Sequence, residues 1–129
     1  MPRKKRILIV EDEESLLKLE TILLTVRGFE VIGAITGKMA IEKIGVEKFD
    51  LVLLDIMLPD VDGFEVCRQI RKDPRTAAVP IIMLTGRKAQ DDHDRGVLCG
   101  ADAYLVKPFK SAMIIDEISR LLSLSGTGT

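Results

Sequence analysis

Short runs of consecutive apolar residues, each about as long as a β-strand, constrain the fold more than any other feature of this sequence. Five such runs occur, at residues 6–10, 29–34, 51–54, 81–84 and 103–106. The first, third and fourth are apolar at consecutive positions, as expected for strands covered on both faces. Each run is separated from the next by a segment with helical spacing. This alternation predicts an α/β fold, a doubly wound parallel sheet of five strands with five helices.

The helical segments differ in the clarity of their apolar stripes. The first places Leu16, Leu19, Leu23 and Val26 at intervals typical of an inward face, and Gly28 follows where a left-handed residue closes a helix. The last carries a stripe of five residues, Ile114, Ile115, Ile118, Leu121 and Leu122. Weaker versions of the pattern at residues 39–44, 64–70 and 97–98 predict three middle helices.

The 129 residues suit one domain, with a basic N-terminal extension at 1–5, a folded unit at 6–122 and a flexible tail at 123–129. A net charge of −1 favours no class of partner, and we interpret the basic run at 3–6 as a solvated terminus rather than a nucleic-acid contact. Cys67 and Cys99 have no metal-ligand spacing, so we expect small buried apolar residues. The sequence shows no signal peptide and no apolar stretch near the roughly 20 residues of a membrane span, which predicts a cytoplasmic protein without membrane association.

The common order of five such strands is 2-1-3-4-5, and it places the ligand site where the first and third strands end. Four acids, 11–14, follow the first strand, and Asp55 ends the third. Glycine-rich phosphate loops are missing, and a bare phosphate would be repelled there. Glu13 and Glu14 fit the first turn of a helix, where acids favour the positive end of the helix dipole.

The remaining acids, Glu11, Asp12 and Asp55, would crowd together and need a cation. Ligands that are all oxygen fit Mg²⁺, which meets phosphoryl oxygens in its other positions. Thr85 and Lys107 follow the fourth and fifth strands and face the same edge. A metal, a nucleophilic carboxylate, a hydroxyl and an ammonium are the parts needed to move a phosphoryl group onto a carboxylate.

On four motifs the chain resembles the receiver domain of two-component response regulators, from Arg6 to about Leu122. The motifs are ILIVEDE at 7–13, DIMLPDVDG at 55–63, LTG at 84–86 and GADAYLVKPF at 100–109. The resemblance implies a phosphoacceptor rather than an enzyme. Its phosphoryl donor is a sensor histidine kinase or a histidine phosphotransfer protein, and its output is a downstream protein or an output domain that this sequence does not contain.

The resemblance also implies residue roles. Asp55 is the phosphoacceptor, and Mg²⁺ is held by Asp12, Asp55 and the main-chain carbonyl of Met57, with Glu11 acting mostly through water. Lys107 pairs with a phosphoryl oxygen, and its peptide bond to Pro108 is cis.

Phosphorylation switches the surface of the fourth helix, fifth strand and fifth helix through Thr85 and Tyr104. Met57 and Arg87 tune the phosphate lifetime toward slow self-hydrolysis. The uncharged residues Leu98, Ala103 and Met113 disfavour a dimer built on charged pairs, so we expect a monomer or a weak phosphorylation-dependent dimer that does not itself bind nucleic acid. His93 is interpreted as a surface residue.

Two alternatives stay open. One is a small Mg²⁺ phosphatase resembling the haloacid dehalogenase group, although those enzymes have an Asp-x-Asp after the first strand, whereas Asp12 is followed here by Glu13 and Glu14. The other is a receiver-like interaction module that is never phosphorylated. Its complete set of site residues argues against it.

Overall fold

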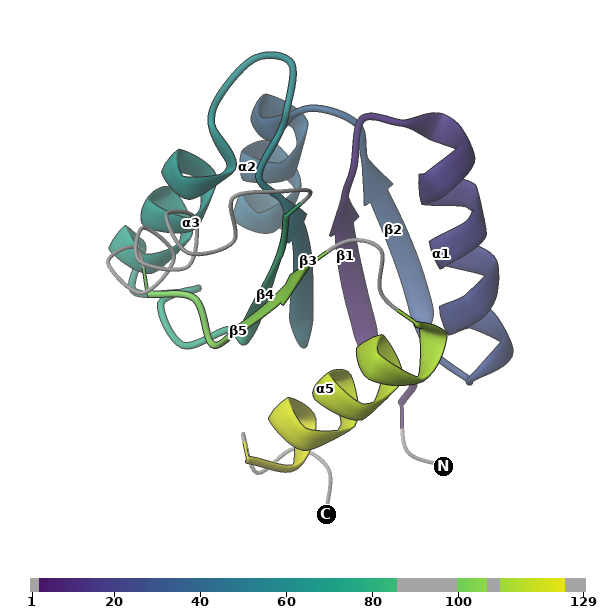
Figure 1. Ribbon diagram of the computed structural model, residues 1–129. Coiled ribbons are helices and arrows are strands. Elements are labelled where there is room, and N and C mark those ends of the chain that lie inside the picture. The colour runs from purple at the N-terminus through teal and green to yellow at the C-terminus, as the bar shows by residue number, and fades with distance from the viewer. Residues whose placement is uncertain (1–2, 86–99, 107–109, 125–129) are drawn as a thin grey trace.

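The computed structural model describes residues 3–85, 100–106 and 110–124. Strands and helices alternate along them: β1 (Arg6–Val10), α1 (Glu14–Val26), β2 (Glu30–Ala34), α2 (Gly37–Val46), β3 (Leu51–Asp55), α3 (Gly63–Lys72), β4 (Ile81–Thr85), β5 (Ala103–Val106) and α5 (Ser111–Leu124). All neighbouring strands pair in parallel, in the order β2-β1-β3-β4-β5 (Figure 1). The predicted sheet and its winding are therefore confirmed. The described residues contain four of the five predicted helices, and the segment at 97–98 lies outside them.

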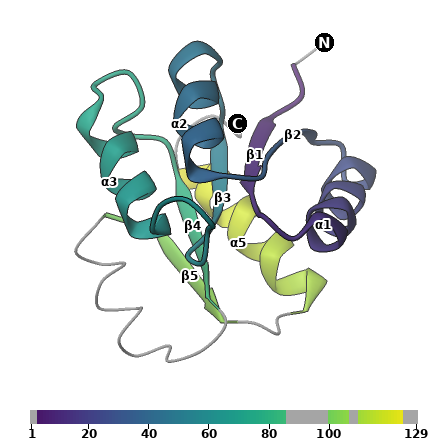
Figure 2. The same cartoon turned by 90° about the horizontal axis from the view of Figure 1, so that it is seen from above.

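Helices cover the sheet on both faces, with α2 and α3 on one side and α1 and α5 on the other (Figure 2). Successive residues of a strand point to opposite faces. On β1, Leu8 and Val10 therefore pack in the cluster with α2 and α3, whereas Ile7 and Ile9 pack in the cluster with α1 and α5. Because both sets are buried, this strand needs an apolar residue at each of these positions.

The inward face of α1 agrees with the prediction only in part: Leu23 packs against the core as expected, but the other contacts differ. Leu19 and Val26, which we expected to face the core, are 63% and 78% exposed. Leu17 and Leu24 pack in the core instead. Gly33 on β2 makes this rotation of the helix feasible, because a Cβ there would approach a methyl carbon of Leu17 to 3.1 Å. Leucines occupy several sides of this helix, so the spacing alone permitted either face.

The prediction of a solvated basic terminus agrees with the exposed side chain of Arg3 but is wrong at Arg6, whose side chain is 18% exposed. Arg6 lies within β1, and its guanidinium forms ion pairs with Glu30 at 3.0 Å and Glu47 at 2.7 Å. Arg3 pairs with Asp50 at 3.3 Å. Because these acids come from β2 and from the α2–β3 connection, the basic run ties neighbouring segments to the start of the sheet.

The ends of two helices bear on other predictions. Gly28 follows α1 with a φ of +95°, which confirms the predicted left-handed closing residue. Helix α5 extends to Leu124, two residues into the segment predicted as a flexible tail, and residues 125–129 lie outside the described ranges.

Two further predictions concern the cysteines and membrane association. Cys67 is buried in α3, as expected, and Cys99 is not described. None of the helices in the described ranges is long and apolar enough to cross a membrane.

Candidate functional site

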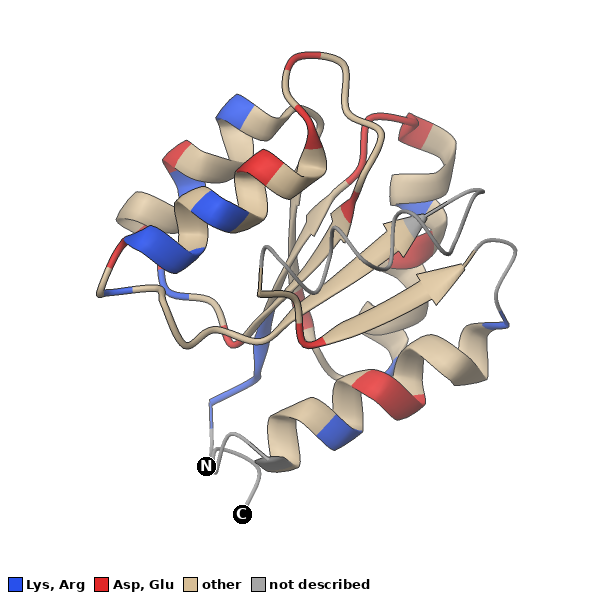
Figure 3. Ribbon diagram, turned by 60° about the vertical axis from the view of Figure 1, so that its left-hand side comes forward, with Lys and Arg blue, Asp and Glu red and all other residues tan. Residues whose placement is uncertain are grey.

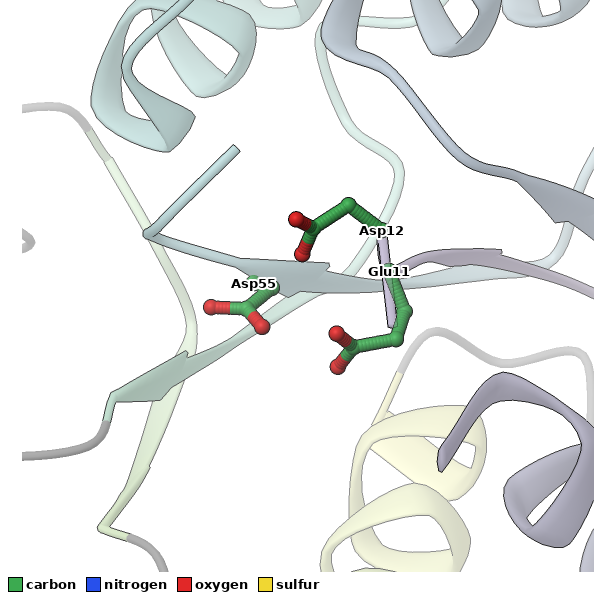
Figure 4. A group of neighbouring side chains, drawn as sticks. All are labelled: Glu11, Asp12 and Asp55. Carbon is green, nitrogen blue, oxygen red and sulfur yellow. The ribbon is translucent and has the colours of Figure 1, made fainter. Parts of the chain in front are cut away.

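Three carboxylates meet at the carboxyl edge of the sheet, where β1 and β3 end side by side. Each of Glu11, Asp12 and Asp55 offers an oxygen, and these oxygens lie within 4.8 Å of one another. Figure 4 shows the three side chains converging on one space between the strand ends. Glu11 and Asp55 are only 1% and 4% exposed, whereas Asp12 is open to solvent. The winding of the sheet thus brings together the acids that the sequence placed at its reversal point.

Backbone hydrogen bonds fix the direction of the two buried carboxylates. The N–H of Met57 donates to Oδ1 of Asp55 at 3.0 Å, and the N–H of Glu13 donates to Oε2 of Glu11 at 3.1 Å. Each bond is made two residues further along the chain, so it belongs to the turn in which the strand ends. The turns therefore hold the carboxylates toward each other.

The electrostatics of this cluster favour a cation. Two unit charges about 5 Å apart repel by about 3 kcal/mol at an effective dielectric constant near 20. A cluster of oxygens in which two carboxylates are buried and one is open to water fits Mg²⁺, which prefers few protein carboxylates and retains several water ligands. The donor set is therefore compatible with a magnesium site formed by Glu11, Asp12 and Asp55.

The connection between β3 and α3 is packed tightly against the end of β3. Gly63 donates its N–H to the carbonyl of Ile56 at 2.9 Å. A Cβ at Gly63 would overlap the main-chain oxygen of Asp55 and lie 2.7 Å from the Cα of Ile56. Asp62 precedes this glycine, and its carboxylate accepts the N–H of Phe64 at 2.8 Å, which caps α3. Only glycine at the first position of α3 allows the chain to come back this close to the end of β3.

Asp60, in the same connection, is a residue for which the sequence suggested no role. Its carboxylate accepts two backbone N–H groups at the start of α2, those of Gly37 at 2.8 Å and Lys38 at 2.9 Å. These bonds, that of Lys38 first, hold the pKa of the Asp60 carboxyl below its ordinary value. The partners are more than twenty residues away in the sequence, so no local pattern around Asp60 could reveal them.

The structure describes some of the other predicted site residues and leaves others undescribed. Thr85 is the last residue of β4, the strand next to β3, and pairs in register with Val106. Tyr104 on β5 packs against the core on the side of α2 and α3, and its hydroxyl is buried. The side chain of Met57 is 74% exposed. Predictions for Arg87, His93, Leu98, Lys107 and Pro108 fall outside the described residues.

Comparison with known proteins agrees with this fold. The family model of the response regulator receiver domain matches residues 7–119. The chain belongs to this family, and its function is that of a receiver domain of two-component signal transduction. Receiver domains are signalling modules, and the curated relatives described below are transcriptional regulators.

The similar proteins place the chain in this family along nearly its whole length. PhoP of Bacillus subtilis, the alkaline phosphatase synthesis transcriptional regulatory protein, is 40% identical over 121 residues, 94% of this chain and 50% of PhoP. PhoB of Rhizobium meliloti, a phosphate regulon transcriptional regulatory protein, is 41% identical over 117 residues, 91% of this chain and 52% of PhoB. The chain thus spans about half the length of the curated relatives it matches.

Solved structures agree on the fold. A CheY-like receiver domain protein from Methanospirillum hungatei superimposes with a TM-score of 0.91 at 32% identity, over 98% of this chain and all of that one. The receiver domain of a Pseudomonas aeruginosa sensor histidine kinase superimposes with a TM-score of 0.87 at 30% identity, over 94% of this chain and 99% of that one. In that Pseudomonas structure a magnesium ion is coordinated in the active-site cleft.

Proposed function

We propose that this chain is a Mg²⁺-dependent phosphoacceptor that takes a phosphoryl group onto Asp55. The observation that carries the proposal is the convergence of Glu11, Asp12 and Asp55, with one oxygen of each within 4.8 Å of the others. A buried cluster of like charges is costly and has no evident value for stability. Its position at the reversal point of the sheet, in a chain of this family, supports a site for a metal and a phosphoryl group.

In the proposed reaction an oxygen of Asp55 attacks the phosphorus of a phosphohistidine on the kinase or phosphotransfer protein. The P–N bond breaks, its electron pair goes to the imidazole nitrogen, and an acyl phosphate forms on Asp55. The hydrogen bond from the N–H of Met57 holds the Asp55 carboxylate in its direction. Mg²⁺, when bound, neutralises negative charge on the phosphoryl oxygens.

The residues around Asp55 complete the proposed site. Asp12 and Asp55, the carbonyl of Met57 and, through water, Glu11 hold the metal. Lys107, oriented by a cis peptide bond to Pro108, pairs with a phosphoryl oxygen. These roles rest on the resemblance to the family.

The proposed output is a change of surface. Thr85 bonds to the phosphoryl group and Tyr104 moves inward behind it, which shifts the surface around β5 and α5 between two arrangements. Met57 and Arg87 tune the lifetime of the phosphate. The chain acts in the cytoplasm as a monomer or a weak phosphorylation-dependent dimer, and it controls a downstream protein or an attached output domain without itself binding nucleic acid.

Intact-protein mass spectrometry after incubation with acetyl phosphate and Mg²⁺ tests this function. We expect one phosphoryl adduct on the wild type, none on Asp55→Asn, and an unchanged adduct on Asp73→Asn, a control at the end of α3 remote from the site. Absence of the adduct from the wild type, or its persistence in Asp55→Asn, contradicts the proposal.

A further inference from the structure

The side chain of Asp60 attaches the connection between β3 and α3 to the N-terminus of α2. Asp60 reaches from this connection to the first two residues of α2 and accepts the N–H of Gly37 and of Lys38. Thr36, the N-cap residue, accepts the next N–H, that of Met39, at 3.0 Å. Every backbone donor in the first turn of α2 before Ala40 thus has an acceptor, and two of the three are satisfied by Asp60.

The contact is close as well as polar. A Cβ at Gly37 would overlap a methyl carbon of Val61, the residue after Asp60, and lie 2.9 Å from a methyl carbon of Val66 on α3. The missing side chain at Gly37 therefore lets the connection settle directly on the end of α2. Negative charge is favoured there because the N-terminus of a helix carries a partial positive charge.

This attachment matters for the site because of where it lies in the connection. At one end the N–H of Met57 is bonded to Asp55, and at the other Gly63 is bonded to the carbonyl of Ile56. Between these ties the chain leaves the sheet and returns, and the bonds of Asp60 link its middle to a separate element. Leu58 and Val61 of the connection also pack against the core, but the bonds of Asp60 supply polar contacts between its middle and α2.

We propose that Asp60 is a positioning residue for the metal site, which it serves by fixing the backbone of Met57 relative to the three carboxylates. The inference rests on the proposed function, since it takes the Met57 carbonyl as a metal ligand. Asp60 touches neither the metal nor the phosphoryl group. Its two hydrogen bonds to α2 hold the connection in the position that Mg²⁺ binding requires, so the affinity for Mg²⁺ depends on a residue outside the ligand set.

Titration of ¹⁵N-labelled protein with Mg²⁺, followed by NMR, tests this role. We expect the dissociation constant of Mg²⁺ to rise roughly tenfold in Asp60→Ala, the scale typical of residues that orient metal ligands. Asp60→Asn keeps one acceptor oxygen, so its increase is smaller. The experiment is repeated in about 0.5 M KCl, where screening weakens a simple charge effect but leaves a displaced backbone unchanged.

Thr36→Ala separates positioning from helix stability. It removes the other cap of α2 without touching the β3–α3 connection, so we expect its Mg²⁺ affinity to equal that of the wild type. If Thr36→Ala weakens Mg²⁺ binding as much as Asp60→Ala does, Asp60 acts only through the stability of α2 and the inference is wrong. If Asp60→Ala does not fold, Asp60→Asn is compared with Thr36→Ala on the same criterion.

The outcomes also distinguish the two proposals. A wild type that binds Mg²⁺ and accepts phosphate, beside Asp60 variants with unchanged Mg²⁺ affinity, overturns the positioning role alone. A wild type that does not bind Mg²⁺ overturns the proposed function and this inference together.

Discussion

The two edges of the sheet carry charge in opposite arrangements. At the amino edge, arginines pair with acids, as Arg6 does with Glu30 and Glu47. At the carboxyl edge, acids gather with acids, as Asp12 and Asp55 do. In Figure 3, red segments (Asp and Glu) lie in the β1–α1 and β3–α3 connections, and blue segments (Lys and Arg) lie near the N-terminus, at the other end of the sheet. The formal net charge of −1 conceals this separation.

The difference separates stability from function. Paired charges at the amino edge fasten distant segments to one another, so they contribute to the free energy of unfolding. Clustered acids at the carboxyl edge oppose folding, and stability alone gives no reason to keep them. Substitutions at the amino edge should therefore destabilise the fold without altering the metal site. Substitutions among the acids should alter the metal site without destabilising the fold.

The largest effect is expected at Arg71, in the last turn of α3, which lies at the amino edge of the sheet. Its guanidinium donates to the carbonyls of Val79 and Gly100 and to the carboxylate of Asp102, the last at 2.7 Å. Charged hydrogen bonds of this kind contribute more than neutral ones, and Arg71→Met leaves several acceptors without their donor, so we expect a loss of about 3 kcal/mol in the free energy of unfolding. Urea denaturation measures it, with Arg68→Met on the same helix as a nearly neutral control. Equal losses in both variants would contradict the view that Arg71 joins three segments.

The next largest effect is expected at Gly63, where the β3–α3 connection returns to the site. Gly63→Ala inserts a Cβ against backbone atoms of Asp55 and Ile56, which cannot rotate away. We expect destabilisation by about 2 kcal/mol in urea and weaker phosphorylation of Asp55. Gly45→Ala in α2 is the matched control, because apart from the backbone of its own helix nothing lies within 4 Å of its added Cβ, and alanine favours the helix. Unchanged stability in Gly63→Ala would show that the chain at Gly63 is not tightly packed against the end of β3.

The sequence predicts this fold well because buried parallel strands have an unambiguous signature. The apolar runs at 6–10 and 103–106 coincide with β1 and β5 at both ends. The sheet order then brings Glu11 and Asp55 to one place without any knowledge of side-chain positions.

Other features depend on contacts between residues far apart in the sequence, which no local sequence pattern predicts. The face of α1 is chosen by the space that Gly33 leaves for Leu17 on a neighbouring strand. Asp60 forms its bonds more than twenty residues away, and the partners of Arg6 likewise lie far along the chain. Sequence reasoning therefore found the acids of the site but neither the residue that we propose to position its metal-binding connection nor the ion pairs of the opposite edge.

A smaller change is expected at Asp12, the exposed member of the acidic cluster. Asp12→Asn removes one of three neighbouring negative charges, so without Mg²⁺ we expect the free energy of unfolding to rise by about 1 kcal/mol. With Mg²⁺ the order reverses, because a cation bound to the folded state stabilises the wild type more than the variant. Thermal unfolding with Mg²⁺ and with EDTA measures both effects. A variant that is less stable than the wild type in EDTA would show that Asp12 has a structural partner.

The smallest effect is expected at Asp73, where α3 ends. Hydrogen bonds from the side chain and backbone of Arg75 lower the pKa of this carboxyl from 3.8 to about 2. A pKa that is lowered in the folded state contributes stability above its unfolded value, and this contribution is lost as the pH falls through the folded value. Asp73→Asn should therefore be slightly less stable than the wild type at pH 5, and the difference should shrink steadily as the pH falls from about 4 toward 2. Urea midpoints along this range measure it, with the exposed Asp116→Asn on α5 as a control. Because the pair is exposed, added salt should weaken the difference, and a difference independent of pH would mean that Asp73 acts through packing and that its charge is irrelevant.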